Sequence, residues 1–322
     1  MLRVGLLSVA HMHVDAYVAA LGAHLRSEIV GLFDPDESRT TAFSERTGIP
    51  AFGRIDDLLA LCDAVVICSE NNGHADLVVR AAEAGKAILC EKPLAAGEAD
   101  LQRIQKAVEG AGVLLMTAFP CRFSPAYARL KARVDGGEIG RVRAVAATNR
   151  GTCPMGWFVQ KGLSGGGAMI DHVVHVADLL RDLFGGDPAR VQAQTGNNLY
   201  GGSWDDTAMV TMEWADGTFA TLDSSWSRPK GYKTWGDVTM TVVGEAGTIE
   251  MDMFGPGVKV YGADGYRSSA YGSDLDAAMV DAFVQACLDG APVPTTMRDG
   301  LHAARIALAG YRSVAAGEPV AV

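Results

Sequence analysis

The 322-residue chain lacks features that mark two large classes of protein. It has no basic block, since 28 Lys and Arg stand against 38 Asp and Glu and the formal net charge is −10. Nucleic-acid binding relies on clustered Lys and Arg, so the charge balance argues against a nucleic-acid partner. No apolar run approaches the roughly 20 residues of a membrane-spanning helix. We therefore expect neither nucleic acid nor membrane as a partner.

The chain also lacks paired cysteines. Its six cysteines are scattered, and none forms a C-x-x-C pair. This spacing does not predict a disulfide framework. The first residues, "MLRVGLLSVAHMH", lack the pattern of a signal peptide, because their apolar core is short and no small-residue cleavage site follows. We therefore expect a reducing, cytoplasmic compartment.

Glycine is missing where a nucleotide-binding fold normally carries it. The stretch "VGLLSVAHMHVDAY" (4–17) predicts an apolar strand, a turn and a helix. Ser8, Ala10 and His13 stand where three glycines would be expected. His11 and His13 form an H-x-H turn of the kind that ligates zinc in some hydrolases. The turn is therefore either a modified cofactor loop or a metal site.

The first third of the chain alternates strand and helix patterns. Helices are predicted at 74–86 and 97–112, and β-rich apolar runs occur at 2–9, 28–34, 63–69, 87–93 and 113–119. Continuous apolar strands separated by amphipathic helices indicate a parallel sheet covered on both faces. We predict an α/β fold whose residues 1–119 form a Rossmann domain with a doubly wound parallel sheet.

The pattern changes near residue 120, where strands follow one another with few helices between them. We predict strands at 141–149, 190–196, 206–214, 217–226, 237–243, 247–253 and 257–261. Predicted helices lie at 124–135, 168–184, 274–289 and 299–316. Residues 120–322 are therefore predicted to form an α+β domain with a large mixed or antiparallel sheet, for substrate binding and oligomerisation.

Three positions carry residues suited to redox chemistry. Asp34 ends the second predicted strand, where an acid accepts hydrogen bonds from an adenosine ribose and favours NAD over NADP. Asp171 and His175 are spaced i, i+4 on one helix face, so the carboxylate can orient the imidazole as a general base. The same spacing also occurs on plain solvated helix faces. His172 points about 100° away from Asp171, so it need not join that pair.

The segment "CEKPLA" (90–95) follows an apolar strand. In open α/β sheets, ligands bind outside the carboxyl ends of the strands. An ammonium group there, such as that of Lys92, can hydrogen-bond a reacting oxygen and stabilise developing alkoxide charge.

Taken together, these motifs resemble the Gfo/Idh/MocA oxidoreductases, which include glucose–fructose oxidoreductase and inositol dehydrogenase. The resemblance runs along almost the whole chain and is most specific in the EKP segment at 91–93 and the "GGGAMIDHVVH" segment at 165–175. It implies an NAD(H)-dependent dehydrogenase acting on a hydroxyl or carbonyl of a sugar, polyol or inositol. It also implies a homodimer or homotetramer formed through the second sheet.

Carried over position by position, the resemblance implies that Lys92, Asp171 and His175 are catalytic, with His175 as the general base. Glu70 departs from the frequent proline of the family. The implied substrate contacts are Arg122, Arg150, Trp157 and His172. The implied cofactor contacts are Ser8, Ala10, His11, Met12, Asp34, Ser69, Asn71, His74, Glu91 and Lys92. No metal is expected.

Other interpretations stay open. His11 or His13 would hold an ion in the cleft together with Asp171, His172 or His175. A hydrolase of the same fold would retain NAD and use it transiently for glycosidic cleavage. A cofactor-sensing binding protein would have lost catalysis, which the glycine-poor turn favours and the intact catalytic set opposes.

Overall fold

The computed structural model describes residues 1–232, 234, 236–255, 257–262, 265–270 and 274–322. Two compact units contain these residues. The first unit spans residues 1–120 and 274–301, and the second spans 121–273 and 302–322. The predicted division into 1–119 and 120–322 differs from these units in one segment, because residues 274–301 pack with the first unit. Helix α9 (Leu275–Asp289) contacts the first helix, α1 (Val14–Ala23).

The first unit is built on a five-stranded parallel sheet, as predicted. The strand order is β2-β1-β3-β4-β5. The strands are β1 (Leu2–Val9), β2 (Ser27–Phe33), β3 (Ala64–Cys68), β4 (Ala87–Cys90) and β5 (Leu115–Thr117). All five residues of β3 are buried, which explains its continuous apolar sequence.

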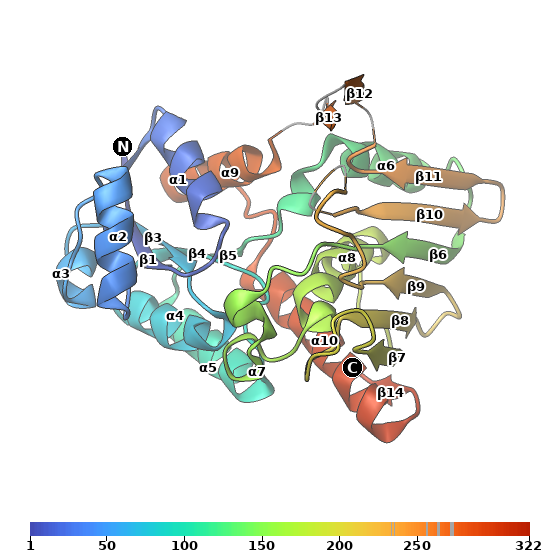
Figure 1. Cartoon of the computed structure of the whole chain (residues 1–322). Coiled ribbons are helices and arrows are strands. Elements are labelled where there is room, and N and C mark those ends of the chain that lie inside the picture. Colours follow the sequence, from blue (N-terminus) through green and yellow to red (C-terminus); the bar gives the residue numbers. More distant parts are fainter. Residues whose placement is uncertain (233, 235, 256, 263–264, 271–273) are drawn as a thin grey trace. The chain divides into compact units, whose positions relative to one another are not determined.

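Helices cover both faces of this sheet. Figure 1 shows α1 and α9 on one side and α4 and α5 on the other. Helix α4 spans His74–Glu83 and helix α5 spans Glu98–Ala111. The other helical elements between β2 and α4 are α2 (Glu37–Thr47), α3 (Ile55–Leu59) and the 3₁₀ turn η1 (Asn71–Gly73). Asp36 caps α2 by accepting from the backbone of Ser38 and Arg39, and Gly48 ends it with φ of 74°.

The order of the strands places a topological switch point between β1 and β3. From β1 the chain moves to β2 on one side, and from β2 it returns across β1 to β3. Ligands of open α/β sheets bind at such a point, outside the carboxyl ends of the strands. The turn after β1 and the segment after β3 therefore flank the expected ligand edge. The amide of His11 donates to the carbonyl of Cys68 at 2.8 Å and ties these two segments together.

The second unit contains a seven-stranded mixed sheet. Its order is β11-β10-β6-β9-β8-β7-β14, with β6 and β9 parallel and the other neighbours antiparallel. The strands are β6 (Val142–Thr148), β7 (Arg190–Gly196), β8 (Thr207–Glu213), β9 (Phe219–Asp223), β10 (Thr239–Gly244), β11 (Thr248–Asp252) and β14 (Val320–Ala321). A separate hairpin joins β12 (Gly257–Gly262) to β13 (Gly265–Ala270).

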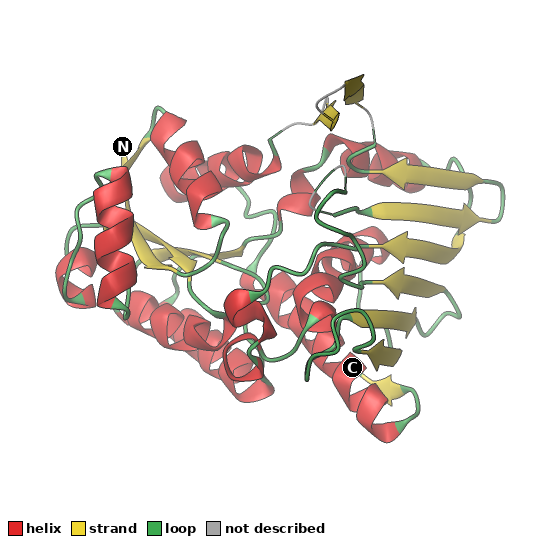
Figure 2. Ribbon diagram, viewed as in Figure 1, coloured by secondary structure: helices red, strands yellow, loops and turns green. Residues whose placement is uncertain are grey.

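Helices pack against one face of this sheet, as Figure 2 shows for α6 and α8. The helical elements are η2 (Pro120–Phe123), α6 (Pro125–Asp135), η3 (Gly156–Val159), α7 (Lys161–Ser164), α8 (Ala168–Phe184) and α10 (Met297–Ala316). Burial alternates along β8, so that one face joins the core and the other is exposed. Among the described residues of the second unit, the elements that were not predicted are β13, β14, α7 and the 3₁₀ turns η2 and η3.

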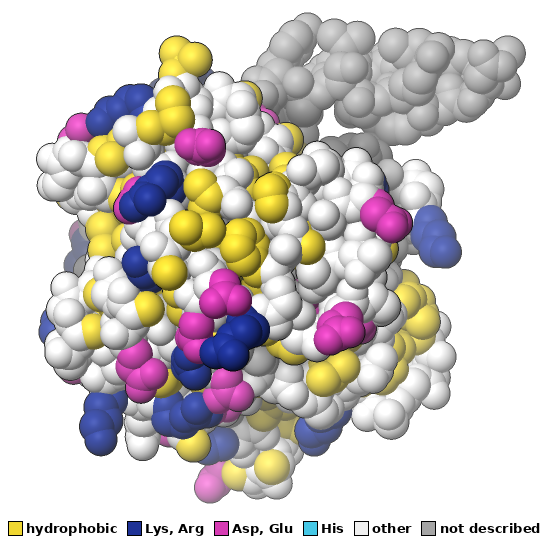
Figure 3. Space-filling view, turned by 90° about the vertical axis from the view of Figure 1, so that its left-hand side faces the viewer, with side chains coloured by type: hydrophobic (Ala, Val, Ile, Leu, Met, Phe, Trp, Pro, Cys, Tyr) yellow, Lys and Arg dark blue, Asp and Glu magenta, His cyan; other side chains and the backbone are white. Residues whose placement is uncertain are grey.

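The face of the molecule drawn in Figure 3 carries mixed charges, as the absence of a basic block in the sequence predicts. On the face of the molecule drawn in Figure 3, acidic and basic side chains are interspersed with apolar ones. Within the described ranges, no helix has both the length and the apolarity needed to cross a bilayer.

Candidate functional site

The turn after β1 keeps the backbone shape that glycine would favour. Ser8 has φ of 65°, in the left-handed region that non-glycine residues rarely occupy. Its hydroxyl donates to Asp34 Oδ2 at 2.8 Å, and the amide of Val9 donates to the same oxygen at 2.8 Å. A side-chain hydrogen bond thus stabilises a conformation that glycine would adopt without strain. At the start of α1, the N-cap His13 makes no side-chain capping bond.

Asp34 follows β2, where the sequence predicted it, and its side chain is buried. Its Oδ2 serves the β1 turn, whereas Oδ1 accepts from the amide of Asp36 at 2.8 Å and from Arg39 Nη2 at 2.9 Å. Asp34, the predicted acceptor for the ribose, therefore also holds together the turn after β1 and the loop after β2. Arg39 was not predicted as a site residue. Its guanidinium also donates a hydrogen bond to the carboxylate of Glu70.

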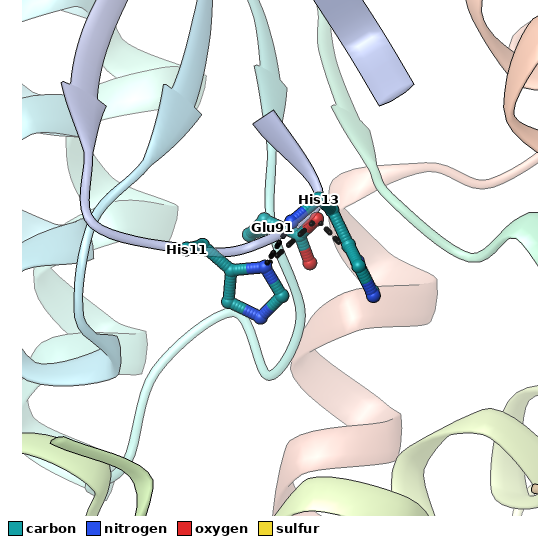
Figure 4. A group of neighbouring side chains, drawn as sticks. All are labelled: His11, His13 and Glu91. Atoms are coloured by element: carbon teal, nitrogen blue, oxygen red, sulfur yellow. Dashed lines mark hydrogen bonds and ion pairs between the residues drawn. The ribbon is translucent and has the colours of Figure 1, made fainter. Parts of the chain in front are cut away.

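Figure 4 shows His11, His13 and Glu91 pointing toward one another. His13 Nδ1 lies 2.9 Å from Glu91 Oε1, and His11 Nδ1 lies 3.7 Å from the same oxygen. Burial alone would raise the pKa of Glu91, but His11, His13 and Lys92 outweigh it and hold that pKa well below its usual range. Burial would lower the pKa of His13, but Glu91 raises it above its ordinary value. The cluster is thus a buried carboxylate neutralised by imidazole.

These three residues also bring together enough donor atoms to hold a metal ion, because one ligand atom from each lies within 4.8 Å of the others. The existing bonds compete with that role. Glu91 Oε1 already accepts from Tyr17 Oη at 2.5 Å as well as from His13, and Oε2 accepts from the amide of Lys92 at 3.0 Å. His11 Nδ1 accepts from the amide of His13 at 3.2 Å. An ion bound through Glu91 Oε1 and the two Nδ1 atoms would have to displace these bonds.

The segments after β3 and β4 are joined by His74. Its Nδ1 lies 2.9 Å from the carbonyl of Pro93, and burial lowers its pKa. Of the predicted cofactor contacts after β3, Ser69, Asn71 and His74 are all buried. His74 therefore positions the EKP segment instead of presenting its ring to solvent. Lys92 lies directly after β4 with 4% of its surface exposed.

In the second unit, the glycine run before α8 allows a close approach of two loops. A Cβ on Gly167 would lie 2.0 Å from the carbonyl oxygen of Asp205. Asp205 replaces the missing cap, because its carboxylate accepts from the amides of Gly167 at 2.9 Å and Met169 at 2.8 Å. Tyr311 donates to the same carboxylate at 2.9 Å. The N-terminus of α8 is thus satisfied by the protein itself.

Helix α8 carries Asp171, His172 and His175, all of them buried. Asp171 Oδ2 accepts from the indole Nε1 of Trp226 at 3.2 Å and lies 3.3 Å from His172 Nε2. His172 was predicted to point away from Asp171, but the length of the two side chains brings their polar ends together. Trp226 was not predicted as a site residue, although it ends the strand predicted at 217–226.

Aromatic side chains surround this part of α8. Trp226 lies in an apolar cluster with Cys153, Phe158 and Ala168, against which Trp157 and Trp204 pack. Trp157, a predicted substrate contact, stacks on Phe158 with ring centroids 3.9 Å apart. The apolar faces of such rings suit the C–H faces of a sugar or cyclitol.

Two predicted substrate contacts are committed to ion pairs inside the second unit. Arg122 Nη2 lies 2.6 Å from Asp178 Oδ1, and Arg122 Nη1 lies 2.8 Å from Asp182 Oδ1. Arg150 Nη2 lies 3.0 Å from Asp237 Oδ2, and Arg228 binds the same oxygen. The structure thus gives both arginines structural partners that the sequence did not reveal, because Asp178 and Asp237 lie far from them along the chain.

Comparison with known families matches both halves of the chain. Residues 3–119 match the model of an oxidoreductase family with an NAD-binding Rossmann fold, GFO/IDH/MocA. Residues 127–250 match the model of the GFO/IDH/MocA C-terminal domain.

Individual relatives agree. The chain is 30% identical over 281 residues to an inositol 2-dehydrogenase of Rhizobium meliloti (strain 1021), covering 81% of each protein. It is 32% identical over 273 residues to a myo-inositol dehydrogenase of Streptomyces leeuwenhoekii, again covering 81% of each. Among solved structures, GenD2 from gentamicin A biosynthesis, in complex with NAD, superposes with a TM-score of 0.90 at 27% identity, covering 100% of this chain and 96% of the other.

Proposed function

Because the chain belongs to the GFO/IDH/MocA family of oxidoreductases with an NAD-binding Rossmann fold, we propose that it oxidises a secondary hydroxyl of a cyclitol such as inositol, or of a related polyol or sugar. The reaction is reversible, and NAD supplies the hydride acceptor when it is bound. The observation that carries the proposal is the match of one chain to both the cofactor-binding and the C-terminal models of the family. Fold alone would not carry it.

The first unit has the features needed to hold NAD. The β1 turn keeps its glycine-like shape at Ser8, α1 begins without a side-chain cap, and buried Asp34 lies at the end of β2. Helix N-termini of this kind bind pyrophosphate through backbone N–H groups. We assign Asp34 to the adenosine ribose, with the turn residues Ala10, His11 and Met12 beside the pyrophosphate.

We propose that Lys92, Asp171 and His175 carry the chemistry, each in the role implied by the family resemblance. His175 takes the proton of the substrate hydroxyl as the hydride leaves the same carbon. Lys92 hydrogen-bonds that oxygen and stabilises the developing alkoxide charge. Asp171, held by Trp226 and His172, orients the imidazole or binds a neighbouring hydroxyl.

The proposed substrate class follows from two considerations. Three relatives at 30% identity or above are named as inositol dehydrogenases. Trp157, Phe158 and Trp226 form apolar surroundings near Asp171 and His172 in the second unit. Hydroxyls on one edge of a ring and C–H groups on its face would match such a mixture of polar and aromatic side chains.

We also propose a homodimer or homotetramer formed through the exposed face of the second sheet. Met209, Phe219 and Val243 are exposed there although they are large and apolar. An apolar sheet face of this kind is commonly covered by a second copy. A cytoplasmic location is consistent with the six cysteines, none of which forms a disulfide.

The test combines cofactor titration with turnover. We expect saturable NADH fluorescence changes, and NAD reduction with myo-inositol or scyllo-inositol in a panel of cyclitols, polyols and sugar acids. Lys92→Ala and His175→Ala should each lower kcat/KM by at least about 100-fold, the usual contribution of an acid or base group. Lys106→Ala removes an exposed lysine of α5 and is the matched control. Unchanged turnover in Lys92→Ala would refute the catalytic assignment, and no NADH binding would refute the proposed function.

A further inference from the structure

Arg39 is held between two carboxylates of different strand ends in the first unit. Its Nη2 lies 2.9 Å from Asp34 Oδ1, after β2, and its Nη1 donates to Glu70 Oε1, after β3, at 2.5 Å. A third carboxylate, Asp36, lies 4.0 Å from Arg39 Nε. The side chain of Arg39 is 31% exposed and that of Glu70 is 16% exposed, so these two side chains reach the surface of the loop edge, whereas Asp34 is buried.

This arrangement resolves an ambiguity in the sequence. At the adenosine ribose, an acid selects the free 2′-hydroxyl of NAD, whereas a nearby arginine accommodates the 2′-phosphate of NADP. The chain has both, Asp34 and Arg39, within six residues of each other. The structure shows which groups pair with the charge of Arg39. Its guanidinium is already bonded to Asp34 and Glu70.

The local charge then opposes a second phosphate. Three carboxylates, those of Asp34, Asp36 and Glu70, lie within 4.0 Å of one guanidinium. A 2′-phosphate brings roughly −1.5 to −2 charge at neutral pH. It would meet net negative charge, and it would have to break an existing pair to reach Arg39.

Of the three acids, Glu70 is the one best suited to a role in selection. Asp34 also accepts hydrogen bonds from Ser8 and Val9, and Asp36 caps α2, so both acids have a structural role. The described side-chain bond of Glu70 is the one to Arg39.

We propose that Glu70 is a specificity-determining residue that sequesters Arg39 from the 2′-phosphate of NADP, so that the preference for NAD depends on Glu70 and not on Asp34 alone. The inference rests on the cofactor site of the proposed function. The inference adds Glu70 to that site as a residue that affects the choice between NAD and NADP and not the chemical step.

The experiment measures dissociation constants for NADH and NADPH by fluorescence titration and compares their ratio, Kd(NADPH)/Kd(NADH). The variants are Glu70→Gln, Glu70→Ala, Arg39→Met and the double variant Glu70→Gln/Arg39→Met. Asp76→Asn is the matched control, because it also removes one carboxylate from an arginine pair: Asp76, exposed on α4, pairs with Arg103 of α5. Thermal melting of each variant reports whether it is folded.

We expect Glu70→Gln and Glu70→Ala to lower the ratio by about tenfold or more, since one full charge within hydrogen-bond distance is worth at least that factor in a protein environment. Asp76→Asn should keep the wild-type ratio. Adding Arg39→Met to Glu70→Gln should cancel the gain in NADPH binding, because the freed guanidinium is what receives the phosphate.

An unchanged ratio in both folded Glu70 variants would overturn the proposal. So would a gain that persists in the double variant, because Glu70 would then act by direct repulsion and not through Arg39. Failure of the proposed function looks different. In that case wild-type protein binds neither cofactor, and the inference falls with it.

Discussion

The hydroxyl of Ser8 donates to Oδ2 of Asp34 at 2.8 Å and thereby joins the turn after β1 to the end of β2. The bond forms although Ser8 has φ of 65°, a conformation that costs a non-glycine residue about 1–2 kcal/mol. A serine in the place of glycine is therefore compatible with the shape of this turn, because its side-chain hydrogen bond offsets the strain of its backbone.

Substitutions at Ser8 should separate these two effects. Ser8→Ala keeps the strained φ and loses a hydrogen bond to a charged group, so we expect it to lower the free energy of unfolding by roughly 1.5–3 kcal/mol. Ser8→Gly loses the same bond but relieves the strain, so its loss should be smaller by about 1 kcal/mol. Urea denaturation measures both. Ser38→Ala, which removes a hydroxyl bonded to exposed Asp36, is the control. A glycine variant less stable than the alanine variant would contradict this account.

Arg122 should behave as a structural residue and not as a substrate contact. Its partner Asp178 has 0% of its side chain exposed, so Arg122→Ala leaves a buried carboxylate without its main cation. We expect a loss of about 3–5 kcal/mol in the free energy of unfolding. Arg133→Ala breaks a half-exposed pair with Glu138 and should cost no more than about 1 kcal/mol. A stable Arg122→Ala protein with a raised KM would instead support the substrate role implied by the family resemblance.

The pair of His13 and Glu91 should make stability depend on pH. Glu91 raises the pKa of His13 in the folded protein above its ordinary value, despite burial. The contribution of protonated His13 is therefore complete below its unfolded pKa of about 6.5, and it is lost as pH rises through the folded pKa. We expect His13→Ala to lower Tm more at pH 6 than at pH 9, each relative to wild type. His24→Ala, whose partner Asp281 is half exposed, should show a smaller difference. Equal losses of Tm at both pH values would contradict the assignment.

Removal of metal should leave the protein unchanged. The oxygens of Glu91 already accept from His13, Tyr17 and the amide of Lys92, so this carboxylate has hydrogen-bond partners without an ion. After dialysis against EDTA, we expect the same Tm and the same NADH affinity as before. Metal content measured before dialysis should be far below one ion per chain. A stoichiometric ion whose loss lowers Tm, and which His11→Ala and His13→Ala proteins fail to bind, would show that H-x-H is a metal site after all.

Much of the fold followed from local sequence. The apolar run at 63–69 and the amphipathic pattern at 97–112 predicted β3 and α5 to within a residue or two. The glycines at 165–167 and 185 marked both ends of α8. Burial on both faces of a parallel sheet leaves a periodicity that neighbouring residues share, so it is legible without any tertiary contact. The EKP and D-x-x-x-H segments were likewise sufficient to indicate the family.

The family and much of the strand and helix pattern could be read from the sequence alone, which also suggested Lys92, Asp171 and His175 as the catalytic residues that we propose. The partners of individual side chains, by contrast, become visible only in the folded chain. Arg39 meets Glu70 across 31 residues, Arg122 meets Asp178 across 56, and Trp226 meets Asp171 across 55. Such pairs depend on which strand ends and helix faces the fold brings together, whereas periodicity reports only the face on which a residue lies.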